Sequence, residues 1–138
     1  MTGARPDVSL VVPADADSVV LARQMVRGIV DLLGWGEESR TDISIAVTEA
    51  CTNVVLHAYP DDEAGEYEVV ADVAPERLVV TVADRGRGFN PRMGSPSPGL
   101  GLGLPLMLAI GDEVAFSTPD GGGTVVRMSF SQTSRRER

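Results

Sequence analysis

The chain has 138 residues, 43% of them hydrophobic, and a formal net charge of −8 at pH 7, which argues against direct binding of nucleic acid. This length can bury one sizeable core, so we expect a single domain over residues 1–138 with its core at about 7–131 and frayed ends. All twelve cationic residues are arginine, which excludes P-loop enzymes, eukaryotic-type protein kinases and Schiff-base enzymes, because each needs a lysine ammonium.

The N-terminal part predicts a strand followed by a long helix. Alternating apolar residues favour an edge strand over residues 7–14 that ends near Pro13. Apolar residues at helical spacing then favour an amphipathic helix over residues 15–34, closed by Gly34.

A second helix is predicted over residues 38–59. It opens on Ser39, with Asp42 three residues later as a variant of the capping box, and stops at Pro60. Its many apolar residues indicate that this helix is largely buried.

The second half of the chain predicts more strands around one glycine-rich segment. Two strands are expected at 67–74 and 77–86, with a turn between them at Pro75 and Glu76. A mobile loop at 86–103 then leads to a short helix at 104–112, with Pro105 in an early position. The last two expected strands, at 113–118 and 124–130, are joined by a turn at 119–123. The order of these elements predicts an α+β fold, a two-layer sandwich of helices on one face of a mostly antiparallel mixed sheet.

Three polar residues interrupt the second helix at four-residue steps. At about 100° per residue, Glu49, Asn53 and His57 fall within an arc of roughly 80°. Buried polar groups need hydrogen-bonding or ionic partners, so these three side chains are candidates for one side of a ligand-binding site.

A carboxylate and two glycines follow the strand at 77–86, in "DRGRGF". Gly86 and Gly88 allow a sharp turn and close approach to a ligand, and Asp84 can accept a hydrogen bond from an exocyclic amine. Thr124, which opens the last strand, can point its hydroxyl back to the same place.

A second glycine motif, "GLGLGLPLM", is predicted to lie just before a helix N-terminus, where exposed N–H groups favour an anion. Taken singly, these patterns are more typical of a plain turn, a linker or a solvated helix stripe. Their conjunction favours one nucleotide site.

Together the motifs resemble those of the GHKL ATPases, the superfamily of gyrase, histidine kinases and MutL, and within it the compact bacterial anti-sigma factor serine kinases of the RsbW and SpoIIAB type. The resemblance runs from Val8 to Phe130 and rests on "TEACTNVVLHAY", "DRGRGF", "GLGLPLM" and "GGGTVVRMSF". It implies the ATP-binding fold of that superfamily.

The resemblance implies a role for each residue of the helix stripe. Asn53 would ligate Mg²⁺ through its amide oxygen and bridge it to the ATP phosphates. Glu49 would act as general base on a serine hydroxyl or on water. His57 would lie in the same nucleotide site, with no role assigned.

The resemblance also implies how the rest of the nucleotide is held. Asp84 would read the adenine amino group, with Thr124 supporting it through water, while Gly86 and Gly88 leave room for the base. The phosphates would be held by Gly101, Leu102, Gly103 and Leu104.

Three functions remain open. The first is an ATP-dependent serine kinase and anti-sigma factor that binds a sigma factor and phosphorylates an STAS-type anti-anti-sigma protein. The second is a non-catalytic ATP-binding switch, favoured by the short segment Asn90 to Pro98 between the glycine motifs. The third is a histidine-kinase catalytic domain, which would need a separate phosphoacceptor histidine.

Composition and helix pattern bear on location and partners. The single cysteine, Cys51, permits no internal disulfide, and no apolar run approaches the roughly 20 residues of a membrane span, so we expect a cytoplasmic protein. Arg23, Arg27 and Asp31 at four-residue steps are either a solvated face or, together with the segment "NPRMGSPSP", the partner-binding surface. The resemblance implies a homodimer.

Overall fold

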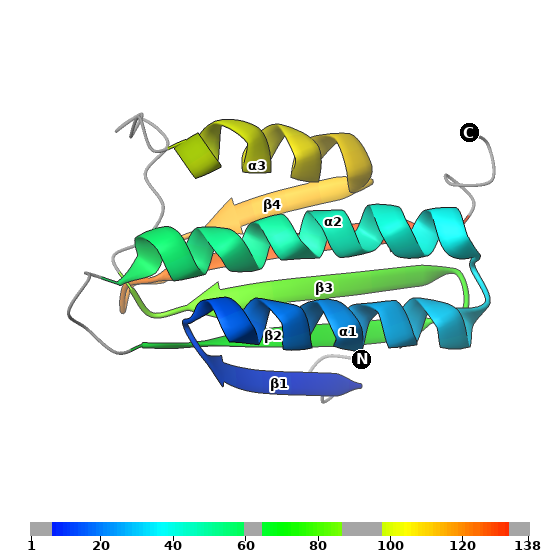
Figure 1. The fold of residues 1–138 in the computed structure, drawn as a ribbon, viewed down its shortest axis with the longest axis horizontal. Helices are drawn as coiled ribbons and strands as arrows, with labels where there is room; N and C mark the ends of the chain where they lie inside the picture. The colour runs from blue at the N-terminus through cyan, green and yellow to red at the C-terminus, as the bar shows by residue number, and fades with distance from the viewer. Residues whose placement is uncertain (1–6, 60–64, 87–97, 133–138) are drawn as a thin grey trace.

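The computed structural model of the chain describes residues 7–59, 65–86 and 98–132, and only the backbone of residues 98–103. Within these ranges, the helices cover one face of a five-stranded sheet with strand order β1-β2-β3-β5-β4 (Figure 1). The four strand pairings described are all antiparallel. The predicted α+β two-layer fold is confirmed.

The sheet buries one face against the helices. In β2, the buried residues Tyr67, Val69 and Ala71 alternate with more exposed ones, as the period of a half-buried strand requires. The predicted strands and both predicted turns are confirmed. The strands are β1 (Val8–Pro13), β2 (Glu66–Ala74), β3 (Arg77–Asp84), β4 (Glu113–Ser117) and β5 (Thr124–Ser131).

Helix α1 (Ala16–Leu33) is capped at both ends. The Asp15 carboxylate accepts a hydrogen bond from the Ser18 N–H at 3.0 Å, which satisfies one of the free donors at a helix start. Gly34 ends the helix with a φ of 72°, as predicted from the sequence.

Helix α2 (Glu37–Asn53) begins earlier than the capping-box pattern predicts. Its N-cap is Gly36, which makes no side-chain cap, and Ser39 lies inside the helix and is buried. The prediction of Ser39 as the opening residue is therefore wrong. Acidic Glu37 and Glu38 occupy the first turn instead, where their charge complements the helix dipole.

A π-helix, η1 (Val54–Ala58), follows α2 directly. The predicted second helix is thus two segments, and its last turn uses i→i+5 hydrogen bonds rather than the α-helical pattern. π-Helical turns are rare and occur often at functional sites.

Helix α3 (Pro98–Ile110) starts earlier than the short helix predicted at 104–112. Proline is favoured at the first helical position because its N–H would be unbonded there in any case, and Pro98 takes that place. Pro105 consequently lies in the helix interior, not near its start. Part of the predicted loop at 86–103 is therefore helical, and residues 87–97 lie outside the described residues.

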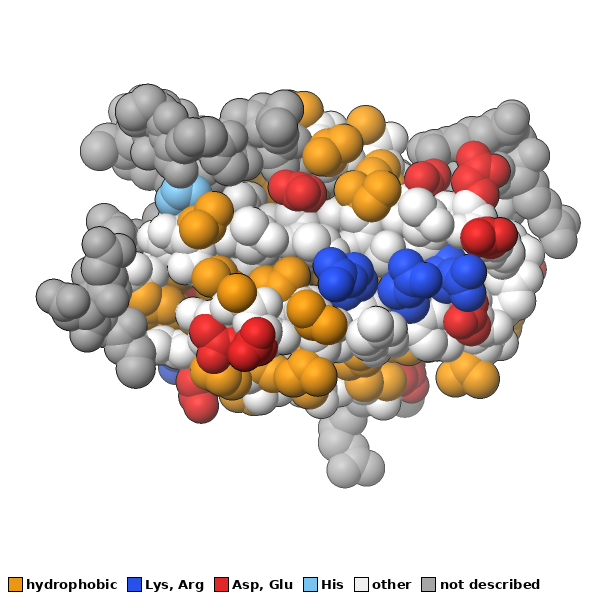
Figure 2. Space-filling view, in the orientation of Figure 1, with side chains coloured by type: hydrophobic (Ala, Val, Ile, Leu, Met, Phe, Trp, Pro, Cys, Tyr) orange, Lys and Arg blue, Asp and Glu red, His pale blue; other side chains and the backbone are white. Residues whose placement is uncertain are grey.

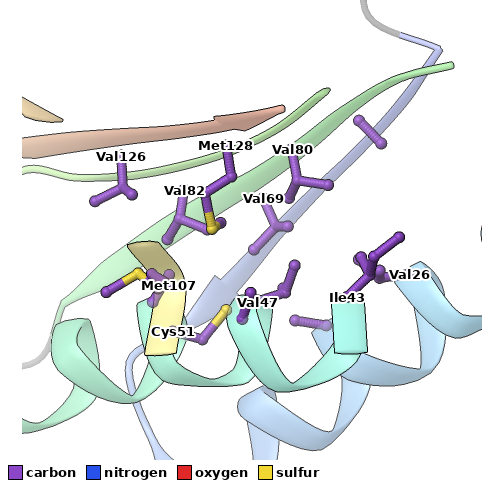
Figure 3. Close-up of a cluster of buried hydrophobic side chains, with 14 of the residues drawn as sticks. Val26, Ile43, Val47, Cys51, Val69, Val80, Val82, Met107, Val126 and Met128 are labelled. Atoms are coloured by element: carbon purple, nitrogen blue, oxygen red, sulfur yellow. The ribbon is translucent and has the colours of Figure 1, made fainter. Parts of the chain in front are cut away.

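Helices α1, α2 and α3 share one hydrophobic core with the sheet (Figure 3). Val26 of α1, Val47 of α2 and Met107 of α3 are fully buried in it, and each such side chain contributes about 1.5–3 kcal/mol by leaving water. Cys51 is also fully buried, and burial raises the pKa of its thiol to about 12. In the described part of the chain, no helix is long and apolar enough to cross a membrane.

Candidate functional site

Several elements meet at one end of the molecule, on the left in Figure 1. β3 ends there, β5 starts there, α2 runs into η1 there, and α3 begins there. The strand register pairs Asp84, the last residue of β3, with Thr124, the first residue of β5. The fold therefore brings together motifs from three distant parts of the sequence.

Asp84 is a buried carboxylate held by backbone donors. It is 7% exposed, and its Oδ1 accepts a hydrogen bond from the Gly86 N–H at 2.8 Å. Burial raises the pKa of Asp84, while backbone hydrogen bonds from Gly86 and Thr124 oppose the rise. A carboxylate held this way is fixed in orientation and can accept a further hydrogen bond from a ligand.

The backbone around the turn after Asp84 packs directly against the backbone of two other segments, the end of η1 and the turn before β5. A Cβ at Gly86 would overlap the carbonyl of Ala58, the last residue of η1. A Cβ at Gly123, whose φ is 90°, would overlap the carbonyl of Asp84. We call this meeting of Ala58, Asp84, Gly86 and Gly123 the backbone junction. It gives Gly86 a packing requirement in addition to the room for a base that the resemblance implies.

Asn53 brings an unpaired acceptor to this end of α2. Its Oδ1 is buried, and no hydrogen-bond donor reaches it within the described residues. A buried amide oxygen without a partner costs about 1–3 kcal/mol, a cost that a bound cation would remove. The oxygen is the type of ligand that Mg²⁺ prefers, so the residue fits that ion.

The other two residues of the predicted stripe are half-buried. Glu49 lies one α-helical turn before Asn53 in α2, as predicted. His57 lies in η1, so the prediction that it follows Asn53 at α-helical spacing is wrong. A π-helix has more residues per turn, so a four-residue step turns the side chain less far around the axis.

The predicted phosphate-binding residues are described only in part. The helix α3 contains Gly99, Gly101, Leu102 and Gly103, so the expectation that this motif lies before a helix N-terminus is wrong. Leu104 is half-buried and lines one hollow together with Thr124. Gly88 lies outside the described residues.

Tyr59 is a residue of this end that the sequence reasoning missed. Its hydroxyl donates to the Glu66 carbonyl at 2.6 Å and accepts from the Arg85 N–H at 3.1 Å. The signal was present in the sequence, because Tyr59 closes the "HAY" string, but the string alone does not show which backbone groups the hydroxyl reaches.

The histidine kinase-like ATPase domain family matches residues 12–130, and the chain belongs to this family. Similar curated proteins include the serine-protein kinases RsbW of Bacillus velezensis and Bacillus subtilis, each 39% identical over 83 residues, which are 60% of this chain and 52% of the relative. The RsbW of Bacillus mycoides is 37% identical over 83 residues, 60% of this chain and 51% of the relative. The chain thus spans about half the length of the curated relatives it matches.

Two solved structures share the fold. The crystal structure of the RsbU and RsbW domains of a Mycobacterium tuberculosis protein matches with a TM-score of 0.68 and 20% identity, over 93% of this chain and 32% of the other. The blue-light activated histidine kinase of Erythrobacter litoralis matches with a TM-score of 0.59 and 26% identity, over 73% of this chain and 33% of the other.

Proposed function

We propose that the chain is an ATP-dependent protein serine kinase that also acts as an anti-sigma factor. It would bind a sigma factor and transfer phosphate to a serine of an STAS-type anti-anti-sigma protein. The curated relatives named serine-protein kinase RsbW support this proposal. The observation on which it rests is the pair formed by Glu49 and Asn53, with the buried Asn53 Oδ1 lacking a donor within the described residues.

Each residue of the site has a task in this reaction. Asn53 would hold Mg²⁺, which supplies positive charge to the phosphate oxygens during transfer. Glu49, one turn away, would take the proton of the attacking serine hydroxyl. Asp84 would bind the adenine amino group, with Thr124 beside it, while His57 and Leu104 line the nucleotide. The backbone of Gly86, Gly88 and Gly101 would complete the nucleotide contacts, whereas Leu102 and Gly103 lie further inside α3, where backbone N–H groups bond to the preceding turn.

Loss of the proposed base tests the chemistry. The partner protein is captured from the native cell by pull-down and incubated with labelled ATP, Mg²⁺ and either the wild type or Glu49→Gln. The variant should bind ATP nearly as well but transfer label about 10²-fold more slowly or worse, the usual worth of a general base. Glu38→Gln, which removes an exposed charge from the same helix, should transfer at the wild-type rate. Equal transfer by the wild type and Glu49→Gln would remove Glu49 from the chemistry.

A non-catalytic ATP-binding switch is the second candidate function. The resemblance implies a lid between Phe89 and Gly99, and this segment is shorter than in the well-known sigma-factor kinases, so it would cover ATP less completely. The same incubation separates the two functions. Label on a serine of the captured partner supports the kinase, whereas partner capture that depends on ATP without any label supports the switch.

We propose that the partner binds over α1 and α2. A cationic patch gathers there in Figure 2, where these helices contribute Arg23, Arg27 and Arg40. Arg40 bonds Asp31 at 3.1 Å, so the predicted set of Arg23, Arg27 and Asp31 gains a third arginine. The double variant Arg23→Glu, Arg27→Glu should weaken partner capture at least 10-fold, about 1.4 kcal/mol, and leave ATP affinity unchanged. Unchanged capture would place the interface elsewhere.

A homodimer and a cytoplasmic location complete the proposal. Light scattering of the purified protein at micromolar concentration should give twice the monomer mass. A monomer mass that persists on concentration would contradict the dimer.

A further inference from the structure

We propose that Tyr59 is a positioning residue, which holds the peptide unit after Asp84 so that the Asp84 carboxylate points at the nucleotide base. This inference rests on the proposed ATP site and assigns it a further residue. Tyr59 itself would not touch the nucleotide.

Tyr59 ties three elements to one another through a single hydroxyl. It lies just after η1, and its Oη bonds to Glu66 at the start of β2 and to Arg85 just after β3. The N–H of Arg85 belongs to the same peptide unit as the Asp84 carbonyl. The hydrogen bond that the Arg85 N–H donates to Tyr59 Oη therefore fixes the plane of the peptide that follows Asp84, the residue proposed to bind the adenine amino group.

The same peptide unit is held from its other side. In a trans peptide, the N–H and the C=O point in opposite directions. Tyr59 Oη accepts a hydrogen bond from the N–H of this unit, which belongs to Arg85. On the other side, the Gly123 backbone packs so closely on the Asp84 carbonyl that a Cβ at Gly123 would overlap the carbonyl oxygen. The peptide between Asp84 and Arg85 is thus clamped between the end of η1 and the turn before β5.

The tyrosine ring is seated independently of its hydroxyl. A Cβ at Gly65 would overlap the ring of Tyr59, so the Gly65 backbone packs closely against the ring. Replacing Tyr59 by phenylalanine should keep this packing and remove only the two hydrogen bonds. The variant therefore tests the clamp, not the fold of the neighbouring strands.

A clamped carboxylate should discriminate between bases. An ionised Asp84 accepts a hydrogen bond from the amino group of adenine, but it repels the carbonyl oxygen that inosine carries in the same place. Loosening the clamp lets the carboxylate move, so the preference for ATP over ITP should fall. A general loss of stability would weaken both nucleotides equally and leave their ratio unchanged.

The test is the ratio of the dissociation constants of ATP and ITP, measured with Mg²⁺ by calorimetry for the full chain. We expect the wild type to prefer ATP and Tyr59→Phe to lose about 10-fold of that preference, the worth of about one hydrogen bond. Ser44→Ala is the control, because it removes a buried hydroxyl that donates to the Thr41 carbonyl at 2.9 Å within α2, away from the clamp. It should keep the wild-type ratio.

The possible failures are distinguishable. A wild type that binds both nucleotides equally, or neither, overturns the proposed reading of adenine by Asp84 and the role of Tyr59 with it. If the wild type discriminates and Asp84→Asn does not, but Tyr59→Phe keeps the full ratio, only the role of Tyr59 is overturned. Equal loss of the ratio in Tyr59→Phe and Ser44→Ala also overturns it, because the effect would not be specific to the clamp.

Discussion

Substituting Gly86 by alanine tests the backbone junction. The added Cβ would overlap the Ala58 carbonyl oxygen, and it would lie 2.5 Å from the Ala58 carbonyl carbon and 2.8 Å from its Cβ. These neighbours are backbone atoms or atoms fixed to the backbone, so no side chain can rotate out of the way. Gly86 and the end of η1 must move apart.

The expected cost follows from general magnitudes. Overpacking a site of this kind destabilises the folded state by about 1–3 kcal/mol. Replacing glycine by alanine also lowers the conformational entropy of the unfolded chain, which offsets about 0.4–1 kcal/mol of that loss. A net loss of about 1–2 kcal/mol remains. Unfolding entropy is about 2.1 cal/mol/K per residue, which for 138 residues is about 0.3 kcal/mol/K, so the Tm should fall by about 3–7 °C.

Thermal unfolding followed by circular dichroism measures this change. The matched control is Gly28→Ala in α1, where an added Cβ meets nothing within 4 Å. That substitution should raise stability by about 0.5–1 kcal/mol, because glycine is unfavourable in a helix interior. A Gly86→Ala variant that melts at or above the wild-type temperature, with Gly28→Ala behaving as expected, would refute the close packing of the junction.

Three further predictions concern single groups. The proposed binding of the adenine amine by Asp84 would need its ionised carboxylate, and burial raises the pKa of that group, so ATP affinity measured by calorimetry should fall on acidification, starting at a higher pH than an ordinary aspartate would give. A pH-independent affinity would contradict this. The buried thiol of Cys51, with a pKa of about 12, should not react with a thiol reagent until the protein unfolds; rapid labelling of the native protein would show it to be accessible. Asp15→Ala removes the α1 cap and should lower the free energy of unfolding by about 1 kcal/mol, whereas Asp17→Ala in denaturant titrations should change it by less than about 0.5 kcal/mol.

The strands and the first helix could be predicted because their patterns are local. The alternating burial of β2 follows from largely alternating apolar and polar residues along that strand. The ends of α1 follow from Asp15 and Gly34, which lie next to the helix in the sequence. The start of α3 could not be predicted, because its glycines argue against a helix and only tertiary packing overrides that preference. The π-helical turn at η1 likewise has no sequence pattern that separates it from a continued α-helix.

The closeness of Asp84 and Thr124 could be predicted, but the packing around them could not. The motifs placed these two residues near one another, and the register of β3 and β5 pairs them, while their roles stay predictions. The backbone junction was not predictable, because the approach of Gly86 to Ala58 joins segments far apart in the sequence. A glycine pattern shows that close approach is possible, but it does not show which backbone comes near.

The central claim is that Asn53 holds a metal ion at an ATP site, and one calorimetric experiment tests it most directly. ATP is titrated into the wild type and into Asn53→Ala, each with Mg²⁺ and again with EDTA. We expect the wild type to bind ATP and EDTA to weaken the binding. In Asn53→Ala the binding should already be weak, and EDTA should change it little. No heat for ATP in the wild type, or the same affinity with and without Mg²⁺, would contradict the account.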